Sequence, residues 1–294
     1  MNALSFRNVT KVFGGRRVLD GASGSAEKGK VIGLLGRNGE GKTTLFKILL
    51  DLLAADSDEV EVLGLRPDGS GRIRQAAGYI PERPSFHSFM SVAEVLELRS
   101  SLYHRWDAAR AAGLCKRLGL DPATRLEGAS KGTLGKLAWV CAAAHDPALY
   151  LLDEPTSGLD ALVREEVLSG LVNELGEAGK TVLVSSHRMD ELAGLLDEVW
   201  VMAGGRIVAV HALDALRADA CVVGGRLRSA DAPPAVPGAI ALGGEGLVRS
   251  WAVLDRAARE RLLGCGALLS PSVEPLPLDR AFSHLLSLKG DELR

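Results

Sequence analysis

The sequence predicts an α/β fold built on a parallel sheet, and three observations carry that prediction. The first is an apolar run, VIGLLG (31–36), followed by a glycine-rich loop and by a segment with helical spacing, KTTLFKILLDLL (42–53). The second is a pair of further apolar runs with the character of buried strands, ALYLLDEP (148–155) and TVLVSSH (181–187). The third is a helical pattern between those two runs, over 162–180. Buried strands that alternate with helices are typical of parallel sheets.

Two segments of different character divide the chain. Helical patterns without strands predict a mostly helical insert over about 84–145. After residue 211, a stretch rich in Gly, Pro and Ala (224–246) precedes strand-like LVRSWAVL, helical DRAARERLLGCG and helical LDRAFSHLLSL. We therefore divide the chain into a large domain, 1–211, and a small C-terminal α/β domain, 212–294.

Composition limits the function classes. With 47% hydrophobic residues among 294, the chain buries a substantial core, and a net charge of −2 with a pI near 6.3 argues against a dedicated nucleic-acid binder. Four separated cysteines without a C-x-x-C pattern predict reduced thiols. No apolar stretch approaches the ~18–20 residues of a membrane helix, and MNALSFRNVT has no signal-peptide pattern. We expect a cytoplasmic protein that meets a membrane only through a partner.

The stretch GRNGEGKTT has the G-x-x-x-x-G-K-[ST] spacing of a phosphate-binding loop, a P-loop. Glycines let backbone N–H groups approach phosphate oxygens, the following helix adds its positive end, lysine reaches the β/γ-phosphates, and the hydroxyl holds Mg²⁺. The strand before the loop and the helix after it are the context that this motif requires. The candidate ATP-binding residues here are Gly36, Arg37, Asn38, Gly39, Glu40, Gly41, Lys42, Thr43 and Thr44, with Thr43 also a Mg²⁺ ligand.

The stretch LYLLDEP supplies two acids at the end of a buried strand. Asp153 is placed to hold Mg²⁺, as a Walker-B carboxylate does. Glu154 is placed to orient and deprotonate the attacking water. Alone, such a pair of acids is more often a solvated turn, but at a strand end about 110 residues after a P-loop it indicates the second half of a nucleotide site.

With those motifs in place, LLDEPTSGLDA resembles the nucleotide-binding subunit of an ABC transporter, and the resemblance covers about residues 3–211. It implies a P-loop, RecA-like core with an N-terminal antiparallel β edge and a helical subdomain. It also implies that Phe13 in KVFGG stacks on adenine, that Asp160 in SGLD belongs to the nucleotide-contacting D-loop, and that His187 touches the γ-phosphate. For Phe13 the alternative is a core aromatic, and for His187 a histidine with an ordinary structural partner.

The sequence departs from the family pattern at three places. The signature segment, commonly L-S-G-G-Q, is ASKGT here, and the resemblance implies that Ser130 and Gly132 contact ATP bound to the opposite subunit. The Q-loop position carries Glu82 in GYIPE, and a carboxylate there is a good Mg²⁺ ligand. Glu40 occupies a position that is usually small, where its side chain lies either beside the bound phosphates or in solvent.

The resemblance implies an ATPase that pairs with a second copy of itself or a paralogue around two ATP molecules and drives separately encoded transmembrane subunits. The protein would lie on the inner face of the cell membrane through those subunits, with no nucleic-acid partner expected. Glu82 and the C-terminal extension favour export over import. The loop RPSFHSFMS adds Phe86 and Phe89, which either contact the membrane partner or pack inside the helical subdomain.

The sequence leaves other functions open. One is a soluble ABC ATPase without a transport role, although such proteins usually carry two nucleotide domains or a long coiled coil. Another is a subunit that binds ATP with weak hydrolysis, which the altered signature ASKGT favours. A GTPase lacks support because the guanine-reading N-K-x-D motif is absent. The cargo, the direction of transport, the choice between homodimer and heterodimer, and the role of the C-terminal domain are not specified by any motif.

Overall fold

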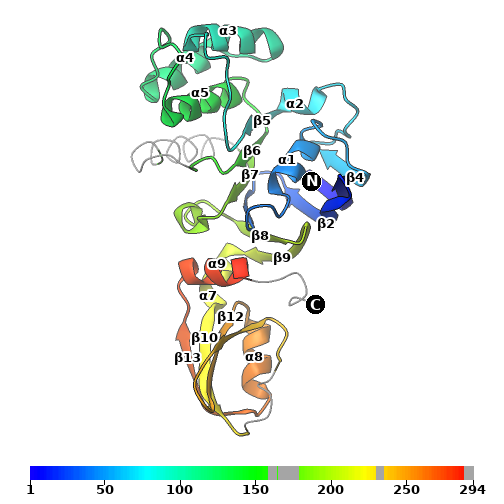
Figure 1. Ribbon diagram of the computed structural model, residues 1–294, viewed down its shortest axis with the longest axis vertical. Coiled ribbons are helices and arrows are strands. Elements are labelled where there is room, and N and C mark those ends of the chain that lie inside the picture. Colours follow the sequence, from blue (N-terminus) through cyan, green and yellow to red (C-terminus); the bar gives the residue numbers. More distant parts are fainter. Residues whose placement is uncertain (158–163, 165–178, 230–234, 288–294) are drawn as a thin grey trace.

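Three β-sheets organise the part of the chain that the structure describes (Figure 1). The computed structural model describes residues 1–157, 164, 179–229 and 235–287. The central sheet has the order β5-β6-β7-β3-β8-β9, in which all neighbours run parallel except β8 and β9. Its strands are β3 (Val31–Leu35), β5 (Ala77–Ile80), β6 (Leu149–Asp153), β7 (Thr181–Ser186), β8 (Glu198–Ala203) and β9 (Arg206–Ala212). The predicted parallel sheet is confirmed.

The apolar runs in the sequence account for the centre of this sheet. Every residue of β3, β6 and β7 is buried, because helices or loops cover both faces of a parallel sheet. The helix predicted over 162–180 between β6 and β7 lies, apart from residue 164 and the last two residues, outside the described part of the chain.

Helix α1 (Lys42–Leu49) follows the glycine-rich loop but ends four residues before the predicted boundary. The reason is local hydrogen bonding after Leu50. Asp51 adopts a left-handed conformation with φ 57°, its N–H donates to Ile48 O at 3.0 Å, and the N–H of Leu52 donates to Lys47 O at 2.8 Å. This is the Schellman arrangement, which satisfies the last helical carbonyls and stops the helix.

A separate antiparallel sheet, in the order β2-β1-β4, forms the N-terminal edge that the resemblance implies. Its strands are β1 (Asn2–Phe13), β2 (Arg16–Glu27) and β4 (Ser57–Val62), and the short helix α2 (Arg72–Ala76) follows. The turn between β1 and β2 consists of Gly14 and Gly15, both with positive φ. A two-residue loop of this kind matches the right-handed twist of a hairpin, and it places Phe13 at the tip.

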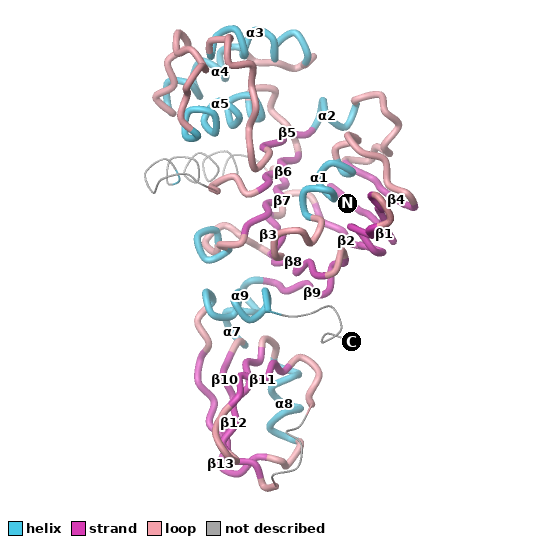
Figure 2. Tube along the Cα trace, viewed as in Figure 1, coloured by secondary structure: helices cyan, strands magenta, loops and turns pink. Residues whose placement is uncertain are grey.

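Helices α3 (Val92–Leu102), α4 (Ala108–Arg117) and α5 (Lys131–Ala143) form a group at one end of the central sheet, where Trp139 of α5 stacks on Tyr150 of β6 (Figure 2). Each begins at a side-chain cap. Ser91 and Glu94 form a capping box on α3, Asp107 caps α4, and Ser130 caps α5. The region between β5 and β6 is described in full and contributes no strand to the central sheet, in agreement with the helical insert that the sequence predicts.

The C-terminal part contains a third sheet, in the order β11-β12-β10-β13, and all its strand pairs are antiparallel. Its elements are α7 (Leu213–Asp219), β10 (Cys221–Leu227), β11 (Ala239–Gly243), β12 (Val248–Val253), α8 (Arg256–Gly264), β13 (Leu268–Pro275) and α9 (Leu278–Ser287). Helix α8 packs on one face through a small core that includes Val223, Trp251 and Leu262 (Figure 1). The strand and two helices that the sequence predicts here correspond to β12, α8 and α9.

Helix α9 returns from this sheet to the large domain. Phe282 and Leu285 belong to the same buried core as Met189 and Leu192 of the 3₁₀ helix η1 (Met189–Leu192), which follows the strand-end residue His187. The boundary at 211 stays a prediction, since β9 passes directly into α7 and part of the core is continuous across it. Over the described residues, the helices are all too short or too polar to traverse a bilayer.

Candidate active site

The glycine-rich loop leaves the carboxyl end of β3 and enters α1 at Lys42. At Gly36 a side chain does not fit, because an added Cβ would lie 2.7 Å from the carbonyl oxygen of Met202. Gly41 has φ 103°, and its Cβ would lie 2.8 Å from both Val18 O and Leu19 Cδ2. The two glycines of the motif therefore hold the loop tightly against β2 and β8, with its backbone N–H groups near a helix N-terminus.

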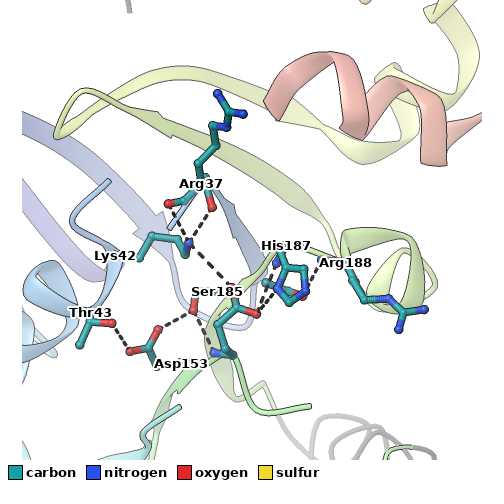
Figure 3. Close-up of polar contacts among 10 residues, drawn as sticks. Arg37, Lys42, Thr43, Asp153, Ser185, His187 and Arg188 are labelled. Carbon is teal, nitrogen blue, oxygen red and sulfur yellow. Dashed lines mark hydrogen bonds and ion pairs between the residues drawn. The ribbon is translucent and has the colours of Figure 1, made fainter. Parts of the chain in front are cut away.

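Lys42 crosses this loop with its side chain only 7% exposed. Its Nζ donates to Gly36 O at 2.6 Å and to Arg37 O at 3.3 Å, and lies 3.8 Å from Oε1 of Glu154 (Figure 3). Among the described residues, Glu154 Oε1 is buried without a hydrogen-bond partner. A buried ammonium group whose partners are loop carbonyls and one under-bonded carboxylate oxygen fits a site that accepts a phosphate chain.

Asp153 lies at the end of β6 and is buried between two hydroxyl groups. Thr43 Oγ1 donates to Asp153 Oδ2 at 2.5 Å, and Ser185 Oγ donates to Asp153 Oδ1 at 2.7 Å (Figure 3). Thr43 and Asp153 thus bring two hard oxygen ligands together at the start of α1, which is the donor set that Mg²⁺ prefers. The predicted pairing of these two residues at one point is present in the fold.

Glu154 and His187 also meet, from the ends of β6 and β7. The Nδ1 atom of His187 lies 2.8 Å from Glu154 Oε2, and the backbone N–H of His187 lies 3.4 Å from the same oxygen. The Glu154 side chain is 9% exposed, whereas that of His187 is 53% exposed. A carboxylate held between Lys42 and a solvent-accessible imidazole is arranged for proton transfer beside a bound phosphate.

Phe13 is 47% exposed at the tip of the β1–β2 hairpin, with Lys11 Nζ 5.6 Å from its ring centroid. It is therefore a surface aromatic rather than part of the core, and the Lys11 ammonium lies over the ring. In the loop itself, Arg37, Asn38 and Gly39 are exposed, and Thr44 lies in the first turn of α1. Glu40 accepts a hydrogen bond from the backbone N–H of Gly204.

Other predicted residues lie away from the loop. The Glu82 side chain is 46% exposed, with Arg83 Nε at 3.9 Å. Ser130 Oγ accepts from Thr133 N–H at 3.1 Å as the cap of α5, in which Gly132 occupies the first turn. Within the described part of the chain, neither Glu82 nor Ser130 forms a hydrogen bond with the phosphate-binding loop. The D-loop residue Asp160 lies outside the described residues.

One residue of this site, Ser185, was not anticipated from the sequence. Ser185 contacts both acids, and the only signal for it was a polar pair at the end of the otherwise apolar TVLVSS. In the neighbouring strand β5, burial raises the pKa of Tyr79, and the negative charge of Asp153 is the second cause.

Comparison with known proteins identifies the family of this chain. A family model described as ABC transporter matches residues 19–157. The chain is 30% identical over 214 residues to the ABC transporter ATP-binding protein YtrB of Bacillus subtilis (strain 168), covering 73% of each chain. It is 31% identical to the Nod factor export ATP-binding protein I of Rhizobium etli, covering 71% of this chain and 68% of that protein.

A solved structure described as the ATP binding subunit of an ABC transporter superimposes with a TM-score of 0.67 at 26% identity, covering 74% of this chain and 92% of that one. The family model spans the phosphate-binding loop and the two acids, and the relatives and this structure are ATP-binding subunits. The chain belongs to the family of ABC transporter ATP-binding proteins, which bind ATP and are ATPases.

Proposed function

We propose that two such subunits, identical copies or this chain and a paralogue, enclose two ATP molecules and hydrolyse them to drive separately encoded membrane-spanning subunits. The observation that carries the hydrolytic part is the contact of Glu154 with His187 at 2.8 Å, beside the buried Lys42. Family membership supports the coupling to transport.

Each residue at the site has a distinct role in this proposal. Lys42 places its charge against the β/γ-phosphates, in a partly desolvated position where that charge acts strongly. Glu154 orients the attacking water and accepts its proton, and His187 holds the Glu154 carboxylate on one side and reaches the γ-phosphate on the other. Phe13 stacks on adenine. Thr43, Asp153 and the more distant Glu82 would hold Mg²⁺, which when bound neutralises phosphate charge.

The signature residues require a second subunit. Ser130 and Gly132 open helix α5, in the helical group that lies apart from α1 and the phosphate-binding loop (Figure 1). The N-terminus of this thirteen-residue helix favours an anion, and its capping residue Ser130 is exposed to solvent. In one chain this end does not contact the loop, so we assign it to the ATP held by the partner subunit.

The transport partner and the direction are part of the same proposal. The name of the Rhizobium etli relative contains the word export, which supports the assignment of this chain to an exporter. Contact with membrane-spanning subunits would place the protein on the inner face of the membrane. In this view residues 1–211 form the ATP-hydrolysing domain and 212–294 an accessory domain.

The experiment that tests this function uses Glu154→Gln, with Glu245→Gln on the exposed surface as the matched control. The amide keeps the size of the side chain but accepts no proton, so we expect hydrolysis to fall by about 100-fold or more while ATP binding survives. ATP trapped in this way should hold two chains together. Size-exclusion chromatography with Mg-ATP should give a dimer for Glu154→Gln and none for Glu245→Gln. A monomer at saturating ATP would refute the two-subunit arrangement.

A further inference from the structure

Ser185 forms two hydrogen bonds through one hydroxyl group. It lies in β7 directly opposite Asp153 of β6 in the parallel register, and it is fully buried. Its Oγ donates to Asp153 Oδ1 at 2.7 Å and accepts from the backbone N–H of Glu154 at 3.0 Å (Figure 3). A hydroxyl is both donor and acceptor, so this one side chain joins the two acidic residues of the site.

The first of these bonds sets the orientation of the Asp153 carboxylate. Oδ1 is occupied by Ser185, and Oδ2 is thereby directed to Thr43 Oγ1. Among the described residues, Asp153 Oδ1 receives no other hydrogen bond. Without the Ser185 hydroxyl, this buried oxygen would lack a donor and the carboxylate would be free to rotate away from Thr43.

The second bond holds the backbone from which the Glu154 side chain projects. Glu154 has φ 48°, a left-handed conformation that is unfavourable for a residue with a side chain. Its N–H is shared between Ser185 O at 3.1 Å and Ser185 Oγ at 3.0 Å. The carboxylate of Glu154 reaches His187 from this strained position, so the direction of the side chain depends on the anchoring of its N–H.

We propose that Ser185 is a positioning residue for ATP hydrolysis, whose hydroxyl orients the Asp153 carboxylate and fixes the backbone of Glu154. It acts through these two residues and touches neither phosphate nor water itself. The proposal rests on the proposed function for the roles of Asp153 and Glu154. A purely structural role, in which the hydroxyl only fills space in the sheet, makes different predictions for binding and for the metal requirement.

The chain offers a matched control one residue away. Ser186 is also buried in β7, but its Oγ accepts from the backbone N–H of Arg188 at 2.9 Å and contacts neither acid. Ser186→Ala therefore removes a buried hydroxyl from the same strand without touching Asp153 or Glu154. Ser185→Ala removes both bonds, whereas Ser185→Thr and the nearly isosteric Ser185→Cys keep a donor at the same place.

Three measurements on the full chain distinguish positioning from packing. We expect Ser185→Ala to lower kcat about 10- to 100-fold, because a misplacement of about 1 Å at a reacting centre costs up to about 100-fold. ATP affinity in EDTA should stay within about twofold of wild type, since the phosphate-binding loop is untouched. The Mg²⁺ concentration needed for tight ATP binding should rise about 10-fold, as it does when partners of a metal ligand are removed.

Rescue and control complete the test. Ser185→Thr should recover most of kcat, and if its extra methyl lowers the melting temperature, Ser185→Cys provides the second donor variant. Wild-type kcat and Mg²⁺ requirement in Ser185→Ala would overturn the proposal. So would an equal loss in Ser186→Ala, or a parallel loss of ATP affinity in EDTA.

The Mg²⁺ titration of ATP binding is repeated in the Glu154→Gln background, where it needs no turnover. If Glu154→Gln still hydrolyses ATP, the proposed role of Glu154 fails, and yet a raised Mg²⁺ requirement in Ser185→Ala would still support the link to Asp153. If that requirement is unchanged, the Ser185 proposal fails alone. The two failures are therefore distinguishable.

Discussion

Glu40 in the phosphate-binding loop is bonded to Gly204, 164 residues later in the chain, at the turn between β8 and β9. Its Oε2 accepts the Gly204 N–H at 2.5 Å, and the next residue, Gly205, accepts the N–H of Asp20 at 3.0 Å. The turn therefore joins the loop to β2. The sequence left two positions open for the Glu40 side chain, beside the phosphates or in solvent. The structure shows a third arrangement, in which this side chain binds the backbone of its own chain at Gly204.

This contact predicts different effects for two substitutions of Glu40. Glu40→Ala removes the acceptor, and the free energy of unfolding without nucleotide should fall by about 1 kcal/mol. Glu40→Gln keeps an acceptor and removes the negative charge, so stability should change less while ATP affinity stays the same or rises. Urea unfolding and calorimetric titration with ATP measure the two effects. Equal unfolding free energies for the two variants would show that the Gly204 bond contributes little.

Phe86 and Phe89 have different environments, although the sequence predicted the same two alternatives for both. Phe86 is half-buried and packs against the main core, whereas Phe89 is 72% exposed and stacks on His87 at 5.3 Å. Phe89→Ser should leave unfolding within about 0.5 kcal/mol of wild type, and Phe86→Ser should destabilise by about 1–3 kcal/mol.

The same two substitutions test whether Phe89 docks on a membrane partner. In a complex purified from its native membrane, Phe89→Ser should reduce coupled ATPase activity while the isolated subunit keeps its basal rate. The Phe86→Ser variant serves as the comparison, since its loss should appear in the isolated subunit too. Unchanged coupling in Phe89→Ser would remove this aromatic from the docking surface.

His145 makes stability depend on pH. It is 1% exposed, stacks on Tyr103 with ring centroids 4.1 Å apart, and has Nε2 3.3 Å from Ala77 O. Burial lowers the pKa of His145 below its ordinary value of 6.5, against the opposing effects of the Ala77 carbonyl and the Asp146 charge. The folded state therefore binds this proton less readily than the unfolded chain does.

The sign follows from that difference. The contribution of His145 to stability is complete above pH 6.5 and is lost progressively as the pH falls below it. Burial also lowers the pKa of His211 and His284, so both act in the same direction. Urea unfolding between pH 8 and pH 5 should show a shallower fall for His145→Gln than for wild type. An identical slope in both proteins would contradict the prediction.

Helix α9 should contribute directly to the stability of the large domain. Phe282 is 3% exposed in a core shared with η1, so Phe282→Ala should destabilise by about 3–5 kcal/mol. Leu263→Ala, at a position 36% exposed on α8, should cost less than about 1 kcal/mol and is the matched control. A fragment ending at residue 211 should melt lower than the full chain, because Met189 and Leu192 lose this cover. A fragment as stable as the full chain would show that the shared core is dispensable.

The sequence alone determined the features that depend on residues close together in the chain. Gly36, Gly41 and Lys42 were identified because backbone freedom, helix start and charge all act within nine residues. Asp153 and Glu154 were identified because they end a buried strand about 110 residues after the P-loop, the order that nucleotide-hydrolysing proteins share. Local physics of this kind leaves a pattern in the sequence.

The tertiary structure decided the contacts that depend on strand register and on which turn packs against which. Ser185 meets Asp153 only because β6 and β7 pair in parallel with those two residues opposite each other. Glu40 meets Gly204 only because the β8–β9 turn folds over the loop. Phe86 and Phe89 are three residues apart, yet Phe86 packs against the buried core and Phe89 is exposed. The sequence around a residue does not predict its distant neighbour, because the free energy of such a contact arises only when the whole sheet has formed.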